Sequence, residues 1–193
     1  MKPVKEFTFK EVVESDWYYD EVKNAFENGL IDGMTADSFA PNKELTVAQA
    51  IKLAAALHQL DKLGRVNLDN GTDVWYSTYV RYAVANEIIG EKYAGYTKDQ
   101  MNAPISREEF VHIFHGAMEY YAQKNDVADN AIPDVKLGDD FADEIYTFYR
   151  AGILTGSDAE GTFNPDSSIK RSEVAAILIR MYDDSARQNI TLN

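Results

Sequence analysis

Apolar residues recur along the chain with the spacing of amphipathic helices. One stripe, with apolar residues at i, i+4, i+7 and i+8, occurs three times, in residues 18–26, 76–84 and 141–149. A second stripe, at i, i+3 and i+4, begins at Ala50, Phe110 and Val174. Such spacings place apolar side chains on one face of an α-helix. The two stripes alternate, so the pattern predicts three helix–loop–helix units and an all-α fold class.

The alternation makes the chain a threefold internal repeat. Thr46, Ser106 and Lys170 stand at equivalent positions, 60 and 64 residues apart. One unit cannot bury both of its apolar stripes alone, whereas three units can enclose a shared core around a pseudo-threefold axis. We therefore expect a single domain over residues 1–193, with repeats at 9–60, 67–123 and 132–183 and a polar tail, frayed or extended, at 184–193.

Capping chemistry marks the start of each second helix. Thr46 with Gln49, and Ser106 with Glu109, fit the capping box, in which the two side chains bond each other's backbone N–H groups. The third repeat has Lys170 at this position, which offers no side-chain acceptor. Its charge also lies at the positive end of the helix, where a cation is unfavourable.

Glycines mark the ends of the first helices. Gly29 and Gly152 stand where a glycine in the left-handed conformation commonly ends a helix. The second repeat has Glu87 at this place, so we expect its helix to end in a different way.

The composition narrows the classes of function. The 193 residues include 32 acidic and 19 basic ones, and the net charge of -13 disfavours binding to nucleic acid or to anionic membrane surfaces. There is no cysteine, which excludes disulfides, thiolate zinc sites and a thiol nucleophile. No apolar run approaches 18 residues, so we expect no membrane insertion. The charged start lacks an apolar signal core, which predicts a cytoplasmic protein or one whose signal peptide has been removed.

Each unit carries a loop and a short box before its second helix. The third unit has Gly156, Gly161-Thr162-Phe163, Pro165 and Lys170-Arg171-Ser172-Glu173. The second has Asn102-Ala103-Pro104 and Ser106-Arg107-Glu108-Glu109, and the first has Gly33, Phe39, Pro41-Asn42 and Thr46-Val47-Ala48-Gln49. An aromatic-rich helix, a glycine-containing loop and a Thr-Arg-Ala-Glu-type box in this order resemble the S-layer homology (SLH) domains of bacterial surface proteins. The resemblance covers residues of about 9 to 183.

This resemblance implies three SLH repeats folded as one spindle-like domain with pseudo-threefold symmetry. It implies a non-catalytic module that binds secondary cell-wall polysaccharide, or another peptidoglycan-linked glycan, in grooves between repeats. Pyruvylated sugars are the ligands commonly bound. The implied location is the cell surface, reached after removal of a signal peptide, with S-layer or other surface proteins as further candidate partners. Nothing in the sequence indicates a cofactor.

The residues expected to bind glycan lie in the boxes, at the helix ends and at the aromatic starts of the first helices. They are Arg107, Arg171, Glu109, Glu173, Gly29, Gly152, Trp17 and Trp75. A box arginine beside the free N–H groups of a helix start forms a compact anion site, which suits the carboxylate of a pyruvyl ketal. Val47 replaces the arginine in the first repeat, so at most two of three sites keep it.

Each of these residues also has a plainer interpretation. The two box arginines can pair with carboxylates of a neighbouring repeat, because acidic residues are plentiful. The two tryptophans can pack their aromatic bodies in the core, which we expect more often than stacking on sugars. The alternative function is an SLH-fold scaffold for assembly that has lost glycan binding, which the departure at Val47 favours.

Metal-binding and catalytic patterns are weak. Glu109 and His112 have the Glu-x-x-His spacing of di-iron bundles, but such sites need a second copy and His58 has no glutamate three residues before it. Residues 158–166 alternate oxygen ligands, yet their glycine is misplaced for an EF-hand loop, which favours a plain turn. No phosphate loop, dinucleotide fingerprint or G-x-S-x-G motif is present, so we predict neither a metal site nor an enzyme.

Overall fold

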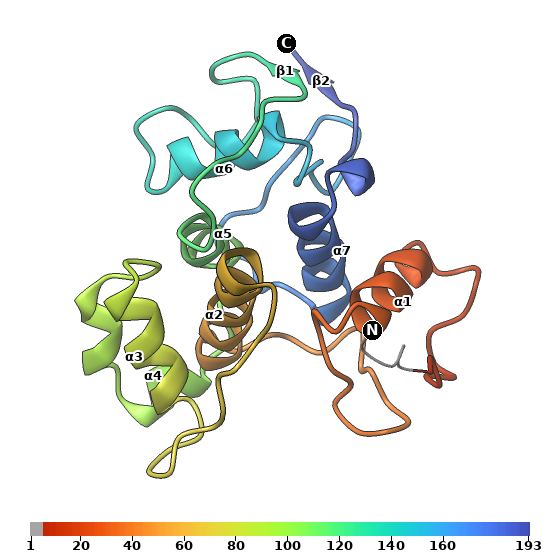
Figure 1. Cartoon of the computed structure of the whole chain (residues 1–193). Helices are drawn as coiled ribbons and strands as arrows, with labels where there is room; N and C mark the ends of the chain where they lie inside the picture. The colour runs from red at the N-terminus through yellow and green to blue at the C-terminus, as the bar shows by residue number, and fades with distance from the viewer. Residues whose placement is uncertain (1–5) are drawn as a thin grey trace.

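A computed structural model describes residues 6–193 of the chain (Figure 1), so residues 1–5 of the predicted domain lie outside it. The described residues contain the α-helices α1 (Tyr19–Glu27), α2 (Val47–Leu63), α3 (Ser77–Ala85), α4 (Lys98–Asn102), α5 (Arg107–His115), α6 (Ala142–Arg150) and α7 (Arg171–Tyr182). They also contain the 3₁₀ helices η1 (Glu91–Gly95) and η2 (Asp184–Ala186) and the strands β1 (Asp126–Val127) and β2 (Thr191–Leu192). The all-helical class is confirmed, with one short parallel strand pair.

The helices of the first stripe lie outside those of the second. Helices α2, α5 and α7 occupy the middle of the molecule, and α1, α3 and α6 surround them (Figure 1). Helix α1 packs against α7, α3 against α2, and α6 against α5, so each outer helix packs on the central helix of a different predicted repeat. The predicted stripe positions of the central helices, such as Ala50, Phe110 and Val174, are fully buried. Each apolar face is thus covered by a neighbouring repeat, because one helix pair cannot cover its own.

The three central helices begin close together. The residues before their caps bond one another in a closed ring: Leu45 N–H donates to Ile169 O (3.0 Å), Ile169 N–H to Ile105 O (3.4 Å) and Ile105 N–H to Leu45 O (2.9 Å). All three side chains are buried. The ring satisfies backbone groups that burial would otherwise leave without a partner.

The N-terminal caps of α2, α5 and α7 differ because their box residues differ. The predicted capping box of Thr46 and Gln49 is confirmed in both directions, at 3.3 and 3.1 Å. The box predicted at Ser106 is only half formed. Ser106 Oγ accepts from Glu109 N–H (3.2 Å), but the carboxylate of Glu109 accepts from two tyrosine hydroxyls instead of returning to the backbone. Lys170 makes no side-chain cap, as expected from its chemistry.

The prediction of a different end for α3 is wrong. Glu87 adopts the left-handed conformation, with a φ of 57°, in the same place as Gly29 and Gly152 with φ of 72° and 75°. Its N–H donates to Val84 O at 3.1 Å and that of Ile88 to Ala83 O at 2.9 Å, which is the bonding found after α1 and α6. The packing of the helix end therefore imposes a conformation that an L-residue adopts only at a cost.

The C-terminal tail begins with η2 and is then extended rather than frayed. Gln188 N–H donates to Gly152 O (2.8 Å), Ile190 N–H donates to the side chain of Asn125 (3.2 Å), and β2 pairs with β1. The tail therefore lies along the end of α6 (Figure 1). Within residues 6–193, no helix combines the length and the apolar character needed to cross a membrane.

Candidate ligand grooves at the repeat junctions

Two grooves open where the predicted repeats meet. Groove A has a volume of about 690 Å³ and is lined mainly by Trp17 and Tyr18, Arg107, loop residues 154–157 and α7 residues up to Arg180. Groove B has a volume of about 300 Å³ and is lined mainly by Trp75, loop residues 31–34, α2 residues 49–53 and Arg171.

The two grooves share one plan. In each groove, one repeat contributes the tryptophan that precedes its outer helix. A second repeat contributes a loop and the central helix that follows this loop. Each groove also takes a box arginine from one further repeat. In groove A the tryptophan comes from the first repeat, the loop and central helix from the third, and the arginine from the second. In groove B the tryptophan comes from the second repeat, the loop and central helix from the first, and the arginine from the third. This correspondence follows from the way each outer helix packs on a neighbouring repeat.

The box arginines link repeats in both grooves. Arg107 and Arg171 are only 7% and 5% exposed. Arg107 Nε donates to Phe163 O at 2.7 Å, and Arg171 Nε donates to Phe39 O at 2.8 Å. Each guanidinium also lies over the ring of the same phenylalanine, at 5.3 and 4.7 Å from its centroid. Both arginines thus hold the loop of the next repeat.

The remaining donors of the two arginines are used differently. Arg107 forms an ion pair with Glu173 in the third repeat, which is the carboxylate pairing that the plainer interpretation expects. Arg171 Nη2 donates instead to the backbone carbonyl of Asp32 at 2.6 Å. Burial lowers the pKa of Arg171, with Asp32 acting in the opposite direction.

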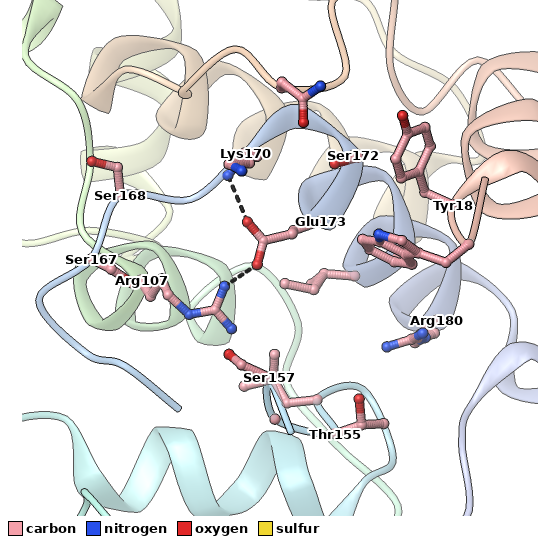
Figure 2. A pocket seen from close by; sticks show the side chains of 16 residues that line it. Tyr18, Arg107, Thr155, Ser157, Ser167, Ser168, Lys170, Ser172, Glu173 and Arg180 are labelled. Carbon is pink, nitrogen blue, oxygen red and sulfur yellow. Dashed lines mark hydrogen bonds and ion pairs between the residues drawn. The ribbon is translucent and has the colours of Figure 1, made fainter. Parts of the chain in front are cut away.

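Glu173 sits between two partners in groove A. Its Oε2 accepts from the backbone N–H of Lys170 at 2.9 Å, while its other oxygen pairs with Arg107 (Figure 2). The side chain of Lys170 is exposed in the groove and pairs with no carboxylate among residues 6–193. Lys170 therefore adds a cation to groove A without helping its own helix.

Arg180 is a second cation of groove A. It projects from the last turn of α7 into the groove (Figure 2). Its Nη1 donates to Ile153 O at 3.1 Å, and its Nη2 lies 3.8 Å from Oε1 of Glu21, beyond hydrogen-bond distance. Its Nε is buried and has no hydrogen-bond partner among the described residues. Arg180 therefore differs from the box arginines, whose Nε atoms are both bonded.

The third junction is filled by the protein's own side chains. Val47 stands there in place of the box arginine. Tyr93, which is fully buried, and Tyr96 donate their hydroxyls to Oε1 of Glu109 at 3.1 and 3.3 Å. Burial and then the charge of Glu109 raise the pKa of both phenols, which keeps them protonated as donors. Nearby, the ring of His112 stacks on an aromatic side chain of the third repeat.

The other predicted glycan-binding residues fall into two groups. Trp17 and Trp75 line grooves A and B. Trp17 is 62% exposed, so the expectation of core packing is wrong for it, and Trp75 is partly buried with Lys52 Nζ 5.9 Å from its ring. Gly29 and Gly152 end their helices and line neither groove.

The sequence analysis predicts Arg107 and Glu173 as site residues but does not single out Arg180, and it gives Lys170 no role in a groove. Arg180 lies at the polar end of a buried helix, where the stripe pattern alone carries no signal. The capping pattern indicates only that Lys170 is an unfavourable cap. Comparison of equivalent positions offered a signal, because the first and second repeats have Ala56 and Gly116 where the third has Arg180.

No group of three or more histidine, aspartate or glutamate side chains in residues 6–193 is arranged to hold a metal ion. The Glu-x-x-His pair does not converge, because Glu109 binds the two tyrosines while Nδ1 of His112 lies 3.3 Å from Glu144. In the loop after α6, Asp158 accepts a hydrogen bond from Thr162 N–H at 2.9 Å. This bond belongs to a turn, which agrees with the plain interpretation of that loop.

Comparison with known families matches two parts of the chain, residues 8–51 and 131–175. Both match the S-layer homology domain. These segments hold the outer helix and the box of the first and third predicted repeats, and the second repeat is not among the matched segments. The SLH resemblance is therefore confirmed for the first and third of the three predicted repeats.

Two curated relatives resemble longer parts of the chain. The surface-layer 125 kDa protein of Lysinibacillus sphaericus is 37% identical over 117 residues, which is 58% of this chain and 10% of the relative. The amylopullulanase of Thermoanaerobacterium thermosulfurigenes is 26% identical over 186 residues, or 92% of this chain and 10% of the relative. The chain thus spans about a tenth of the length of each.

Proposed function

We propose that this chain is a non-catalytic SLH module that attaches a protein to the bacterial cell wall. It does so by binding secondary cell-wall polysaccharide, with pyruvylated sugars as the expected class. The observation that carries the proposal is the presence of two grooves of one design at successive junctions, each with a tryptophan beside polar loop and box residues. Aromatic rings offer apolar faces for sugars, and the polar groups around them offer hydrogen bonds.

The relatives support attachment rather than catalysis. A surface-layer protein and an amylopullulanase both contain a part similar to this chain, and in each that part is about a tenth of the protein. A module that occurs in two such different proteins is better explained by a location that both share than by the separate activity of either. We place the protein that carries this module at the cell surface, with neighbouring surface-layer proteins as further partners.

We propose three SLH repeats with pseudo-threefold symmetry but only two ligand grooves. The closed ring of hydrogen bonds among Leu45, Ile105 and Ile169 supports the symmetry. Tyr93 and Tyr96 occupy the third junction and bond Glu109, so a sugar would have to displace a buried phenol and leave a carboxylate without its donors. Glu109 is accordingly a packing residue in this proposal, while Glu173 remains at the wall of groove A.

Binding to wall sacculi tests this function. The whole chain is incubated with purified Lysinibacillus sphaericus sacculi, either intact or stripped of secondary polysaccharide by acid extraction. We expect co-sedimentation with intact sacculi and its loss with stripped ones. Trp17→Ala combined with Trp75→Ala should weaken binding at least tenfold, while Tyr120→Ala should not change it. Tyr120 is the matched control because it is 76% exposed and lines neither groove.

The second candidate function is a structural scaffold without glycan binding. Both box arginines are buried and bonded to neighbouring repeats, which favours a role in assembling the fold. A folded chain that sediments equally with intact and stripped sacculi, or with neither, would contradict the anchoring proposal and favour the scaffold.

A further inference from the structure

Grooves A and B share a plan but differ in charge. Lys170 of groove A corresponds to Thr46, and Arg180 corresponds to Ala56, so groove B has no cation at either place. Groove B instead has the acidic Asp32 where groove A has Thr155. The extra carboxylate of groove A, Glu173, is already paired with a box arginine.

The two cations that line groove B, Arg171 and Lys52, already contact carbonyls or aromatic rings of the protein. Arg171 is bonded to two backbone carbonyls, and Lys52 Nζ lies over the rings of Trp75 and Tyr79 at 5.9 and 5.3 Å. Among residues 6–193, by contrast, the side chain of Lys170 in groove A pairs with no carboxylate, and Arg180 uses only one donor in a hydrogen bond. A partly buried guanidinium with unused donors is a strong site for a carboxylate, because few water molecules compete there.

We propose that Arg180, with Lys170, makes groove A selective for a sugar unit that carries a carboxylate, and that groove B binds uncharged sugar. This inference rests on the proposed glycan binding and assigns the charge recognition to one groove. The box arginine at the groove wall, Arg107, contributes less, since its Nε holds Phe163 O and its charge is already paired with Glu173. Trp17 supplies the aromatic face beside the charged pair.

Glu21 of α1 acts against the ligand in this scheme. Its carboxylate lies 3.8 Å from Arg180 Nη2, too far for a good hydrogen bond but close enough to offset part of the charge. A ligand carboxylate that approaches Arg180 is repelled by Glu21. Removing the charge of Glu21 should therefore strengthen binding of an acidic sugar, whereas a purely structural Arg180–Glu21 pair predicts only lower stability.

The test uses secondary polysaccharide released from Lysinibacillus sphaericus sacculi, in native form and after carbodiimide activation and borohydride reduction of its carboxylates to alcohols. This reduction leaves any phosphate groups charged, so it separates the two sources of negative charge. Titration calorimetry with the whole chain should give at least tenfold weaker binding of the reduced polymer. Arg180→Gln and Lys170→Gln should each lose affinity for the native polymer, at least tenfold and about threefold, and show little further loss for the reduced one.

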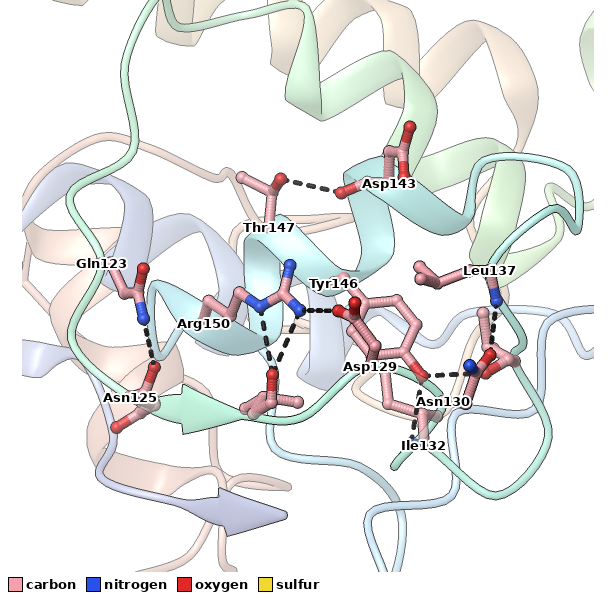
Figure 3. Close-up of polar contacts among 12 residues, drawn as sticks. Gln123, Asn125, Asp129, Asn130, Ile132, Leu137, Asp143, Tyr146, Thr147 and Arg150 are labelled. Atoms are coloured by element: carbon pink, nitrogen blue, oxygen red, sulfur yellow. Dashed lines mark hydrogen bonds and ion pairs between the residues drawn. The ribbon is translucent and has the colours of Figure 1, made fainter. Parts of the chain in front are cut away.

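Glu21→Gln should bind the native polymer two- to fivefold more tightly than the wild type. Arg150→Gln is the matched control, because Arg150 is, like Arg180, a partly buried arginine that donates to a backbone carbonyl and lies near a carboxylate. Arg150 bonds Val127 O at 3.2 and 3.1 Å and Asp129 at 2.6 Å (Figure 3), and it lines neither groove. It should leave the affinity unchanged.

The outcomes separate this inference from the function on which it rests. A wild-type chain that binds neither polymer would overturn both. Equal binding of native and reduced polymer by the wild type, or native affinity in Arg180→Gln, would overturn the assignment to Arg180 and leave glycan binding intact. Should Arg180→Gln fail to unfold cooperatively, the exposed Lys170→Gln variant and the reduced polymer decide the matter. Weaker binding by Glu21→Gln would also contradict the proposal.

Discussion

Replacing Arg171 by alanine should cost several kcal/mol of stability, because this side chain joins the third repeat to the first. Its Nε and Nη2 donate to Phe39 O (2.8 Å) and Asp32 O (2.6 Å), and its guanidinium lies 4.7 Å from the centroid of the Phe39 ring. The alanine variant loses all three contacts and leaves two carbonyls in a region where the arginine is only 5% exposed.

The expected magnitude follows from these contacts. Hydrogen bonds to a charged group are each worth about 1.5–3 kcal/mol, and a desolvated cation–π contact is worth about 2 kcal/mol. Burial disfavours the charged arginine, as the lowered pKa of Arg171 indicates, and this offsets part of the sum. We therefore expect the free energy of unfolding to fall by about 3–5 kcal/mol, since each buried carbonyl left without a donor costs about 1–3 kcal/mol.

The assay is urea unfolding followed by circular dichroism at pH 7, with the midpoint and slope fitted together. Arg171→Lys should lose less than Arg171→Ala, because the ammonium keeps the charge but cannot reach both carbonyls as a planar fork. Arg65→Ala is the control, since Arg65 is exposed, and it should stay within about 0.5 kcal/mol of the wild type. If Arg171→Ala lowers the free energy of unfolding by less than about 1 kcal/mol, with an unchanged dependence on urea, Arg171 does not join the two repeats as argued.

Five further substitutions test the backbone at the helix ends, the third junction and His115. Gly29→Ala should lower the free energy of unfolding by about 1 kcal/mol, because its φ is positive. Gly152→Ala should lower it by about 3 kcal/mol, because the added Cβ would also lie 2.4 Å from a tail carbonyl. Thermal melts of the two variants compare these losses. Glu87→Gly should raise the free energy of unfolding in urea by about 0.5–1 kcal/mol, because glycine adopts the left-handed conformation without strain. A lower free energy of unfolding would contradict strain at Glu87. Val47→Arg should destabilise the fold by at least about 2 kcal/mol in the same assay, since Val47 is 3% exposed. Burial lowers the pKa of His115, so the unfolded state binds a proton first and stability should fall as the pH drops below about 6.5. In urea unfolding at several pH values, His115→Gln should make this fall in stability shallower. An unchanged dependence of stability on pH would exclude a contribution from His115.

The sequence by itself determined the local structure. Apolar spacing placed the six main helices, and Thr46 with Gln49 marked a capping box that forms as expected. These signals are local, because a helix face and a cap involve residues only three or four positions apart. The family resemblance likewise rests on short motifs that the chain displays in order, and it is confirmed for the first and third repeats.

The tertiary structure decided everything that depends on distant pairs. Arg171 and Phe39 are 132 residues apart, so no local pattern shows that the box arginine is held by a loop of another repeat. The left-handed Glu87 and the filling of the third junction by Tyr93 and Tyr96 are also consequences of packing. Residue types alone cannot distinguish a bonded arginine from one with unused donors such as Arg180, because that difference lies in the carbonyls and carboxylates that the fold brings within reach.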